Sequence, residues 1–247
     1  MKILVVNVNT TKSMTAAIGS QARAVANPTT QIVELTPFFG ADSVEGNAES
    51  YLAAIAVLDR VLAYQEPFDA VIQAGFGEHG REGLQEVLDV PVVDITEAAA
   101  HLAHLLGHRF SVVTTLDRTV PLIEDRLLLA GLASHCASVR SSGLSVLELE
   151  GDSEQVATAI AEQARAAVQE DRAEVIILGC GGMAGLDRLV SDLAGVPVVD
   201  GVAAAVKLAE DLVELGLSTS KVRTYAPPRK KAMRYWPLHA FLPNQSN

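Results

Sequence analysis

The chain has 247 residues, 49% of them apolar, and a formal net charge of −11 at pH 7. This length allows one or two domains with a large buried core. The acidic balance argues against nucleic acid as a partner, because phosphate binding needs a basic surface. No apolar run approaches the roughly 18 residues of a membrane helix, and the first residues lack the features of a signal peptide. We therefore expect a cytoplasmic protein without a membrane partner.

Val- and Ile-rich runs alternate along the chain with Ala-, Leu- and Glu-rich stretches of helical periodicity. This alternation is typical of parallel strands joined by crossover helices, so the expected fold class is α/β. Uninterrupted apolar runs such as residues 176–178 indicate strands that are covered on both faces. We predict strands at residues 2–7, 31–35, 69–74, 91–94, 110–114, 174–178 and 197–199. We predict helices at residues 13–26, 48–64, 80–88, 96–106, 119–131, 153–170, 185–193 and 202–215.

Polar residues follow the first predicted strand, at the end where open α/β sheets bind ligands. Asn7, Asn9 and Thr11 stand there, and Asn9 is a candidate for hydrogen bonding to carbonyl and N–H groups of a ligand. The alternative is capping of the next helix. Phe38 and Phe39, further along, are expected either to line an apolar substrate pocket or to pack in the core.

The third predicted strand leads into Gly75-Phe-Gly-Glu-His-Gly80, which has the form G-x-G-x-x-G. Asp94 follows at nearly the spacing of a dinucleotide-binding fingerprint, so a nucleotide-binding protein is one alternative function. That fingerprint normally opens the first strand–helix unit, whereas another pair of strands precedes this loop. A loop that lets the backbone approach a small acid or imide is the simpler interpretation. It makes Phe76 and Gly77 binding residues and leaves His79 able to donate or accept a proton.

Three histidines, His101, His104 and His108, could share one face of the next predicted helix. The residues that match them in the repeat described below, at positions 207, 210 and 214, are charged and look like a solvated face. We therefore predict no metal site. Thr114 and Thr115 end the fifth predicted strand and, like Asn9, are candidates for ligand binding or for helix capping.

Cys180 lies between glycines in Gly179-Cys-Gly-Gly-Met183, after an apolar strand and before a predicted helix. Backbone N–H groups and the helix N-terminus would then surround the sulfur, which predicts a lowered thiol pKa. The N–H groups of Gly181 and Gly182 could also stabilise an oxyanion on a bound substrate. The alternative is a small buried residue at a tight turn. Cys136, without neighbouring glycines, is interpreted as structural.

An internal repeat relates these loops. Residues 69–80 return as residues 174–185, and Val90-Pro-Val-Val-Asp94 returns as Val196-Pro-Val-Val-Asp200. Gly75 in the first copy therefore matches Cys180 in the second. A duplicated unit predicts two pseudo-symmetric parallel-sheet lobes with the active site in the cleft between them. We assign residues 1–97 plus 208–247 to the first lobe and residues 98–207 to the second.

The tail from Arg223 onward departs from this pattern, because it contains Pro227-Pro228, the basic residues 229–231 and Tyr235-Trp236. We expect the tail to pack on the first lobe or on a neighbouring subunit. The basic cluster is interpreted as a solvated patch that offsets an acidic body.

Four segments carry a family resemblance: Asn7-Val-Asn-Thr-Thr11, Gly75-Phe-Gly-Glu-His-Gly80, Val112-Val-Thr-Thr115 and Leu178-Gly-Cys-Gly-Gly-Met183. Together they resemble the aspartate/glutamate/hydantoin racemase superfamily, and most closely the hydantoin racemases. The resemblance implies a cofactor-independent, homo-oligomeric isomerase that racemises a small molecule, a 5-monosubstituted hydantoin, with allantoin-type ureides as related substrates. It also implies one cysteine from each lobe. One thiolate removes the C5 proton, and a thiol on the opposite face returns a proton.

Gly75 departs from the family pattern, because it stands where the first-lobe cysteine belongs. Val8 also departs, since the family usually has proline there. A hydrogen atom cannot transfer a proton, so either racemisation is impaired, as in a variant that traps ligand, or another group serves that face. His79, or a water held by Glu78, are the groups at hand. We expect Gly75→Cys to raise racemisation.

Two other functions remain open. The arylmalonate decarboxylases, which are related to these racemases, keep only the second-lobe cysteine and have glycine in the first lobe, so a single-cysteine decarboxylase is one alternative. A two-lobed solute-binding protein is another. The missing export signal and the glycine-flanked Cys180 argue against the binding protein.

Overall fold

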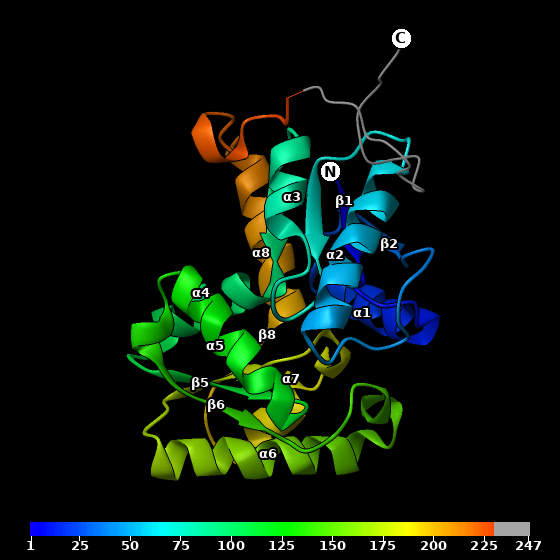
Figure 1. Ribbon diagram of the computed structural model, residues 1–247. Helices are drawn as coiled ribbons and strands as arrows, with labels where there is room; N and C mark the ends of the chain where they lie inside the picture. Colours follow the sequence, from blue (N-terminus) through cyan, green and yellow to red (C-terminus); the bar gives the residue numbers. More distant parts are fainter. Residues whose placement is uncertain (230–247) are drawn as a thin grey trace.

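Two parallel sheets of four strands each organise the protein, which a computed structural model describes over residues 1–229. The first sheet has the strand order β2-β1-β3-β4 and the second has the order β6-β5-β7-β8. Neighbouring strands run parallel, and helices lie against both sheets (Figure 1). The predicted α/β fold with two parallel-sheet lobes is confirmed. We call the part built on β1–β4 the first lobe and the part built on β5–β8 the second lobe.

The strands are β1 (Lys2–Val6), β2 (Gln31–Leu35), β3 (Ala70–Gln73), β4 (Val92–Asp94), β5 (Phe110–Thr114), β6 (Cys136–Ser141), β7 (Val175–Leu178) and β8 (Val198–Asp200). The helices are α1 (Lys12–Val25), α2 (Asn47–Leu62), α3 (Arg81–Val87), α4 (Ile95–Leu106), α5 (Val120–Leu129), α6 (Ser153–Glu170), α7 (Asp187–Ala194) and α8 (Gly201–Glu214). Short 3-10 turns supplement them, among them η4 (Gly181–Met183) and η5 (Arg223–Tyr225).

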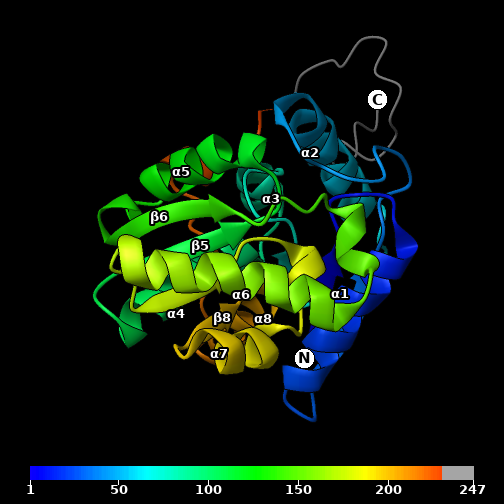
Figure 2. The same ribbon diagram turned by 90° about the horizontal axis from the view of Figure 1, so that it is seen from below.

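The inner strands β1, β3, β5 and β7 are almost wholly buried, which explains their unbroken apolar sequences. Helix α6 lies across the outer face of the second sheet (Figures 1 and 2). Ile160 of α6 and Ile176 of β7 belong to the same apolar cluster. Strand β6 is missing from the predicted strands. It is an edge strand, and Val139 is its one buried residue, so it lacks the apolar run that marks the inner strands.

Helices α4 and α8 join the lobes. Helix α4 contacts β7 and β8 of the second lobe, whereas α8 contacts β3, β4 and α1 of the first. One apolar core consequently includes Ile72 of the first sheet and Ile177 of the second. The predicted domain limits, after residues 97 and 207, fall inside these two helices, and the division itself stays a prediction.

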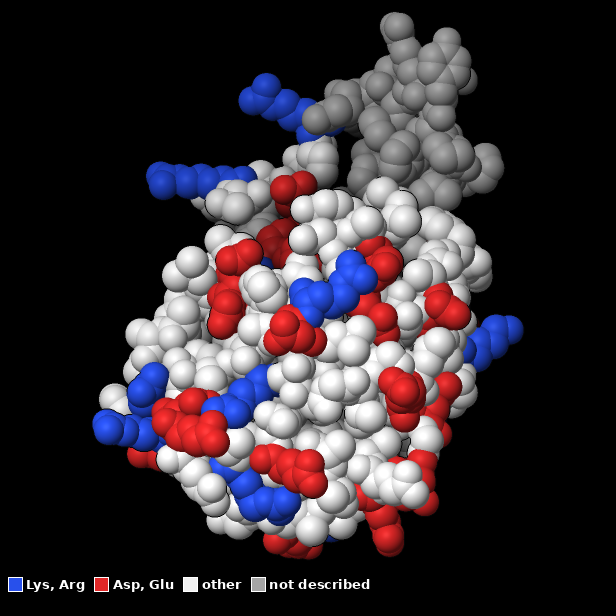
Figure 3. Space-filling model, turned by 60° about the horizontal axis from the view of Figure 1, so that its bottom comes forward, with Lys and Arg blue, Asp and Glu red and all other residues white. Residues whose placement is uncertain are grey.

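Acidic and basic side chains are interspersed on the face of the molecule in Figure 3. In residues 1–229, no helix is long and apolar enough to cross a membrane. The predicted packing of the tail on the first lobe is confirmed where the tail starts, because η5 contacts α3. Residues 230–247, which include most of the predicted basic patch and Trp236, lie outside the described residues.

Candidate active site

An open cavity lies where the inner strands of both sheets end. Residues 7–9 and 74–76 line it from the first lobe, and residues 114–115 and 179–182 line it from the second. In the order β2-β1-β3-β4, the chain leaves β1 and β3 toward opposite edges of the sheet, which opens a crevice between the two loops. The second sheet repeats this arrangement. The predicted inter-lobe cleft is therefore present.

Gly181 and Ala74 bring the two loops into direct contact. A Cβ atom added to Gly181 would lie only 2.5 Å from the carbonyl oxygen of Ala74. Since real Cβ atoms do not approach a carbonyl so closely, position 181 requires glycine. This contact places Gly75, the next residue after Ala74, on the same cavity as Cys180.

The thiol of Cys180 accepts one backbone hydrogen bond, from the N–H of Gly182 at 3.4 Å. Burial nevertheless raises the pKa of Cys180 to about 11, and the negative charge of Glu45 adds to the effect. The predicted lowering of this pKa is wrong. Cys180 precedes η4, a turn of three residues, so it lacks the long helix whose dipole would favour a thiolate. The resting group is a thiol.

Side chains of neighbouring residues cover Gly75. A Cβ atom added there would lie 2.4 Å from Cγ1 of Val8, 2.5 Å from Cδ2 of His79 and 2.8 Å from Nε2 of Gln73. The space that a cysteine would need at position 75 is therefore filled. Val8 is the second departure from the family pattern, and the structure brings it against the first.

His79 lines the same cavity and is only 5% exposed. The loop turns back over Gly75 through Gly77 and Gly80, whose φ angles of +128° and +93° lie in the region that favours glycine. Burial lowers the pKa of His79 to about 4. The imidazole is therefore neutral at pH 7.

Asn9 and Thr114, both predicted binding residues, line the cavity. The Oδ1 atom of Asn9 accepts hydrogen bonds from Nδ2 of Asn7 at 2.8 Å and from the N–H of Thr11 at 3.0 Å. Its Nδ2 atom, however, contacts only the sulfur of Met14, a weak acceptor. The side-chain amide of Asn9 therefore has donor capacity for a stronger acceptor on a ligand. The hydroxyl of Thr114 donates to the carbonyl of Gly179 at 3.2 Å, which joins two cavity loops.

The remaining predicted binding residues divide into two groups. Phe76, Thr115, Gly181 and Gly182 line the main cavity, and Gly77 lines an adjoining cavity that shares Phe76 and His79 with it. Phe39 does not line either cavity and is 36% exposed. Phe38 is also exposed and lies over the guanidinium of Arg60. The two phenylalanines therefore form neither the expected pocket nor the core.

Residues 3–209 match the model of the protein family described as Asp/Glu/hydantoin racemase. The chain belongs to the Asp/Glu/hydantoin racemase family. The predicted resemblance is confirmed, and the protein is a racemase, an isomerase.

Named relatives and solved structures align with nearly the whole chain. A hydantoin racemase of Pseudomonas sp. (strain NS671) is 40% identical over 232 residues, which cover 94% of this chain and 93% of the relative. The crystal structure of allantoin racemase from Pseudomonas fluorescens is 72% identical, with a TM-score of 0.93, and covers 94% of this chain and 99% of that chain. The crystal structure of arylmalonate decarboxylase, at 18% identity and a TM-score of 0.60, covers 91% and 97%. At that identity the likeness shows the fold alone.

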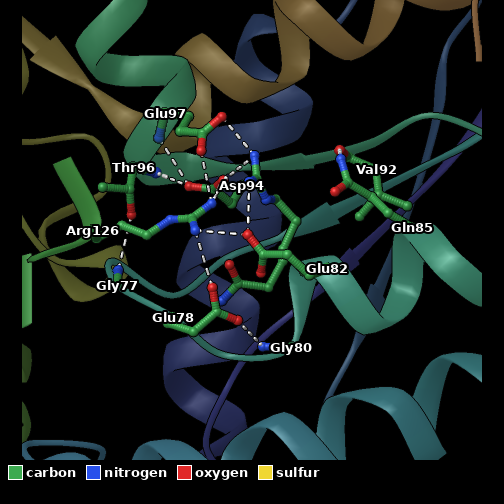
Figure 4. A network of polar contacts seen from close by, with 12 residues as sticks. Gly77, Glu78, Gly80, Glu82, Gln85, Val92, Asp94, Thr96, Glu97 and Arg126 are labelled. Atoms are coloured by element: carbon green, nitrogen blue, oxygen red, sulfur yellow. Dashed lines mark hydrogen bonds and ion pairs between the residues drawn. The ribbon is translucent and has the colours of Figure 1, made fainter. Parts of the chain in front are cut away.

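An ion cluster contacts residues 75–80, here called the Gly75 loop, through Glu78 (Figure 4). Its members are Arg126 of the second lobe and Glu78, Arg81, Glu82, Asp94 and Glu97 of the first. Arg126 is 3% exposed, and its NH1 atom donates to Glu78 at 3.1 Å and to Glu82 at 2.7 Å. Its NH2 atom donates to Asp94 at 3.3 Å and to Glu97 at 2.8 Å. One buried guanidinium thus holds four carboxylates of the opposite lobe.

The ion cluster also fixes the backbone of the Gly75 loop. Asp94 caps α4 by accepting from the N–H groups of Thr96 and Glu97. Thr96 in turn accepts the N–H of Gly77 at 2.9 Å, and Glu78 accepts the N–H of Gly80 at 2.9 Å. Residue 79 is consequently held between two anchored glycines.

The cluster holds more negative than positive charges, so its carboxyl groups compete for ionisation. Burial, together with the neighbouring Glu82, raises the pKa of Glu78 to about 7. Burial acts in the same direction on Glu82, but its hydrogen bond with Glu78 and the nearby arginines outweigh it and lower the pKa of Glu82 to about 2. The two carboxyl groups share one proton near neutral pH.

Several residues of the site carry no sequence signal. Val44 and Val146 come from loops of opposite lobes and both line the cavity. Glu45 accepts the N–H of Val146 at 2.9 Å and so ties those loops together. Arg126 is a charged residue within an ordinary helical pattern, and its partners lie 29 to 48 residues away in the sequence. Only the packing of the lobes reveals these roles.

Proposed function

We propose that this racemase inverts C5 of 5-monosubstituted hydantoins and that allantoin, a hydantoin with a ureido group on C5, is its substrate. The observation that carries the proposal is the thiol of Cys180, which faces a cavity built from matching loops of both lobes. The name of the 72% identical relative, allantoin racemase, supports the choice of substrate.

In the proposed reaction, the C4 carbonyl of the hydantoin acidifies the C5–H bond. Cys180 transfers a proton on one face of C5, and the intermediate is a planar enolate. Backbone N–H groups around Cys180 and the side-chain amide of Asn9 would stabilise the enolate and hold the ring. Because the adjacent carbonyl already activates the C5 proton, the proposed chemistry requires neither a metal nor an organic cofactor.

The test begins with single enantiomers of allantoin and of 5-benzylhydantoin, incubated with the protein in deuterated water. We expect loss of optical activity well above the uncatalysed rate, faster with allantoin, and deuterium at C5 of the product. Cys180→Ser should lower the rate by at least ~100-fold. An unchanged rate in this variant, or no racemisation of either compound by the wild-type protein, would contradict the proposal.

A second candidate is decarboxylation of an arylmalonate by Cys180 alone, since Gly75 leaves one cysteine on the cavity. Release of carbon dioxide from phenylmalonate would favour it. The nucleotide-binding alternative is less well supported, because the N–H groups of Gly77 and Gly80 already donate to Thr96 and Glu78. A phosphate would have to displace those acceptors.

We also propose that the enzyme is a cytoplasmic homo-oligomer. Exposed leucines at the ends of two adjoining helices, Leu105 and Leu106 of α4 and Leu128 and Leu129 of α5, support self-association. Light scattering after size-exclusion chromatography measures the oligomeric state, and a monomer at assay concentration would contradict this part of the proposal.

A further inference from the structure

We infer that His79 replaces the side chain missing from position 75 and transfers the substrate proton on the face opposite Cys180. The inference rests on the proposed racemisation and names the second acid–base group of that same site. It makes the catalytic pair an imidazole and a thiol.

The composition of the cavity lining supports this pair. Among the described residues that line the main cavity, His79 and Cys180 are the two whose side chains titrate in an accessible pH range. The others are apolar residues, glycines, asparagines and threonines. An enzyme that inverts a carbon centre by two-base transfer needs an acid–base group on each face, and His79 is the group that remains.

The position of the ring agrees with this role. Its Cδ2 atom lies 2.5 Å from where the Cβ atom of a residue at position 75 would be. Nε2, which is bonded to Cδ2, therefore lies at the edge of the ring nearest that position. A Cβ atom at Gly77 would lie 3.3 Å from the same Nε2. The imidazole thus covers two glycines and fills the space that a first-lobe cysteine would use.

The surroundings of the ring leave it able to act in both directions. Within residues 1–229, Nδ1 of His79 is buried and makes no well-aligned hydrogen bond, and the backbone of Phe76 is the nearby polar group that raises the pKa of the ring against the effect of burial. Asp94 and Arg126, the charged groups that act on the ring, have opposite signs and oppose each other. A neutral imidazole has one nitrogen that accepts a proton and one that can donate.

For the enantiomer whose C5–H faces His79, the reaction begins at the imidazole. Nε2 takes the C5 proton, and the electron pair of the C–H bond moves into the enolate. The Cys180 thiol then gives its proton to the other face of C5, which leaves an imidazolium and a thiolate. After product release, a proton passes from His79 to Cys180 through water. The opposite enantiomer follows the reverse sequence.

The main experiment compares His79→Gln and Cys180→Ser, using each enantiomer of allantoin in deuterated water. Glutamine keeps polarity and approximate size but cannot transfer protons. We expect His79→Gln to lower racemisation by at least ~100-fold while it retains C5 deuterium exchange in one enantiomer only. Cys180→Ser should retain exchange in the other enantiomer. The control is His101→Gln, an exposed histidine on α4, which should behave as wild type.

His79→Gln that racemises at a rate near that of wild type would overturn the inference, and so would loss of exchange in both enantiomers while substrate still binds. A wild-type enzyme that racemises no hydantoin would instead contradict the proposed function. The two failures are therefore distinguishable.

A second pair of variants serves if His79→Gln does not fold. Gly75→Cys alone should give no gain, because the imidazole fills the space, whereas Gly75→Cys combined with His79→Ala should exceed His79→Ala by at least ~10-fold in racemisation. A gain from Gly75→Cys in the wild-type background equal to that in the His79→Ala background would contradict the claimed overlap. The wild-type pH profile gives a third measurement. Below the titration of Glu78 near pH 7 in the same loop, kcat/KM should fall in a separate step near pH 4, as His79 becomes protonated.

Discussion

At the scale of single residues, burial decides the charge of both groups that face the cavity. It raises the pKa of Cys180 to about 11 and lowers the pKa of His79 to about 4. Each group therefore rests in its neutral form, because a charged form would lose its hydration. The thiol can therefore donate a proton while the neutral imidazole accepts one. A histidinium beside the thiol could not accept a proton.

The pKa of His79 also predicts how stability depends on pH. The pKa of this histidine is 6.5 in the unfolded chain and about 4 in the folded protein. As the pH falls from 6.5 to 4, the unfolded state binds the proton first, so the free energy of unfolding decreases. The loss attributable to His79 totals about 3 kcal/mol.

Urea denaturation of wild type and His79→Gln across this pH range checks the prediction, because the comparison removes the contribution of other groups. The difference between the two proteins should change by about 3 kcal/mol between pH 7 and pH 4. If the free energies of unfolding of the two proteins change with pH in parallel, the pKa of His79 is not lowered in the folded protein and the prediction is contradicted.

Position 75 illustrates how neighbours alter an expectation about one residue. The sequence repeat predicts that Gly75→Cys raises racemisation. In the structure, Val8 and His79 occupy the space that the new side chain would need. Val8 and Gly75, the two departures from the family pattern, thus lie in contact, and the single substitution is now expected to fail.

At the scale of elements, α5 of the second lobe holds the Gly75 loop of the first through Arg126. Replacing Arg126 by Met would leave four carboxylates with Arg81 as the one cation that pairs with any of them among residues 1–229. We expect a loss of about 3–5 kcal/mol in the free energy of unfolding, because one partner of a buried ion pair is removed. The value of kcat should fall at least ~10-fold, since the loop that carries His79 loses its anchor.

Arg140→Met is the matched control for Arg126→Met. Arg140 pairs with Glu170 and Asp171 near the surface, where its side chain is 22% exposed. Its replacement should cost less than about 1 kcal/mol and leave the activity unchanged. Equal losses of stability in the two variants, measured by chemical denaturation, would contradict a special role for Arg126.

At the scale of the whole molecule, the approach of the two lobes at Gly181 sets the width of the active site. A methyl group at position 181 would meet the carbonyl of Ala74 at 2.5 Å. We expect Gly181→Ala to force the loops apart, with a loss of about 1–3 kcal/mol in stability and at least ~10-fold in kcat/KM.

Gly131→Ala is the control for this substitution, because among residues 1–229 no atom beyond the two chain neighbours lies within 4 Å of an added Cβ there. It carries only the backbone strain of a positive φ, about 1–2 kcal/mol, and should not affect turnover. Turnover that falls equally in both variants would argue against a specific contact between the lobes at Gly181.

The sequence alone determined the features that depend on local pattern. Unbroken apolar runs identified the inner strands, glycines marked the loops, and the repeat placed Gly75 and Cys180 in matching positions of two lobes. Strand β6 was not predicted, because an edge strand with polar side chains has no unbroken apolar run. For Phe39, the sequence left pocket and core open, and the side chain is 36% exposed and lines neither of the two cavities described, because an apolar side chain in a loop does not reveal which surface it will cover.

The protonation and position of the groups that act in the cavity depend on how the two lobes pack. The pKa of Cys180 depends on burial and on Glu45, and the anchor of the Gly75 loop depends on Arg126, 48 residues beyond its partner Glu78. The fit of His79 over Gly75 depends on a turn through two glycines with positive φ. Burial and long-range charge act through space, so their effects follow from the packed lobes and not from the order of residues.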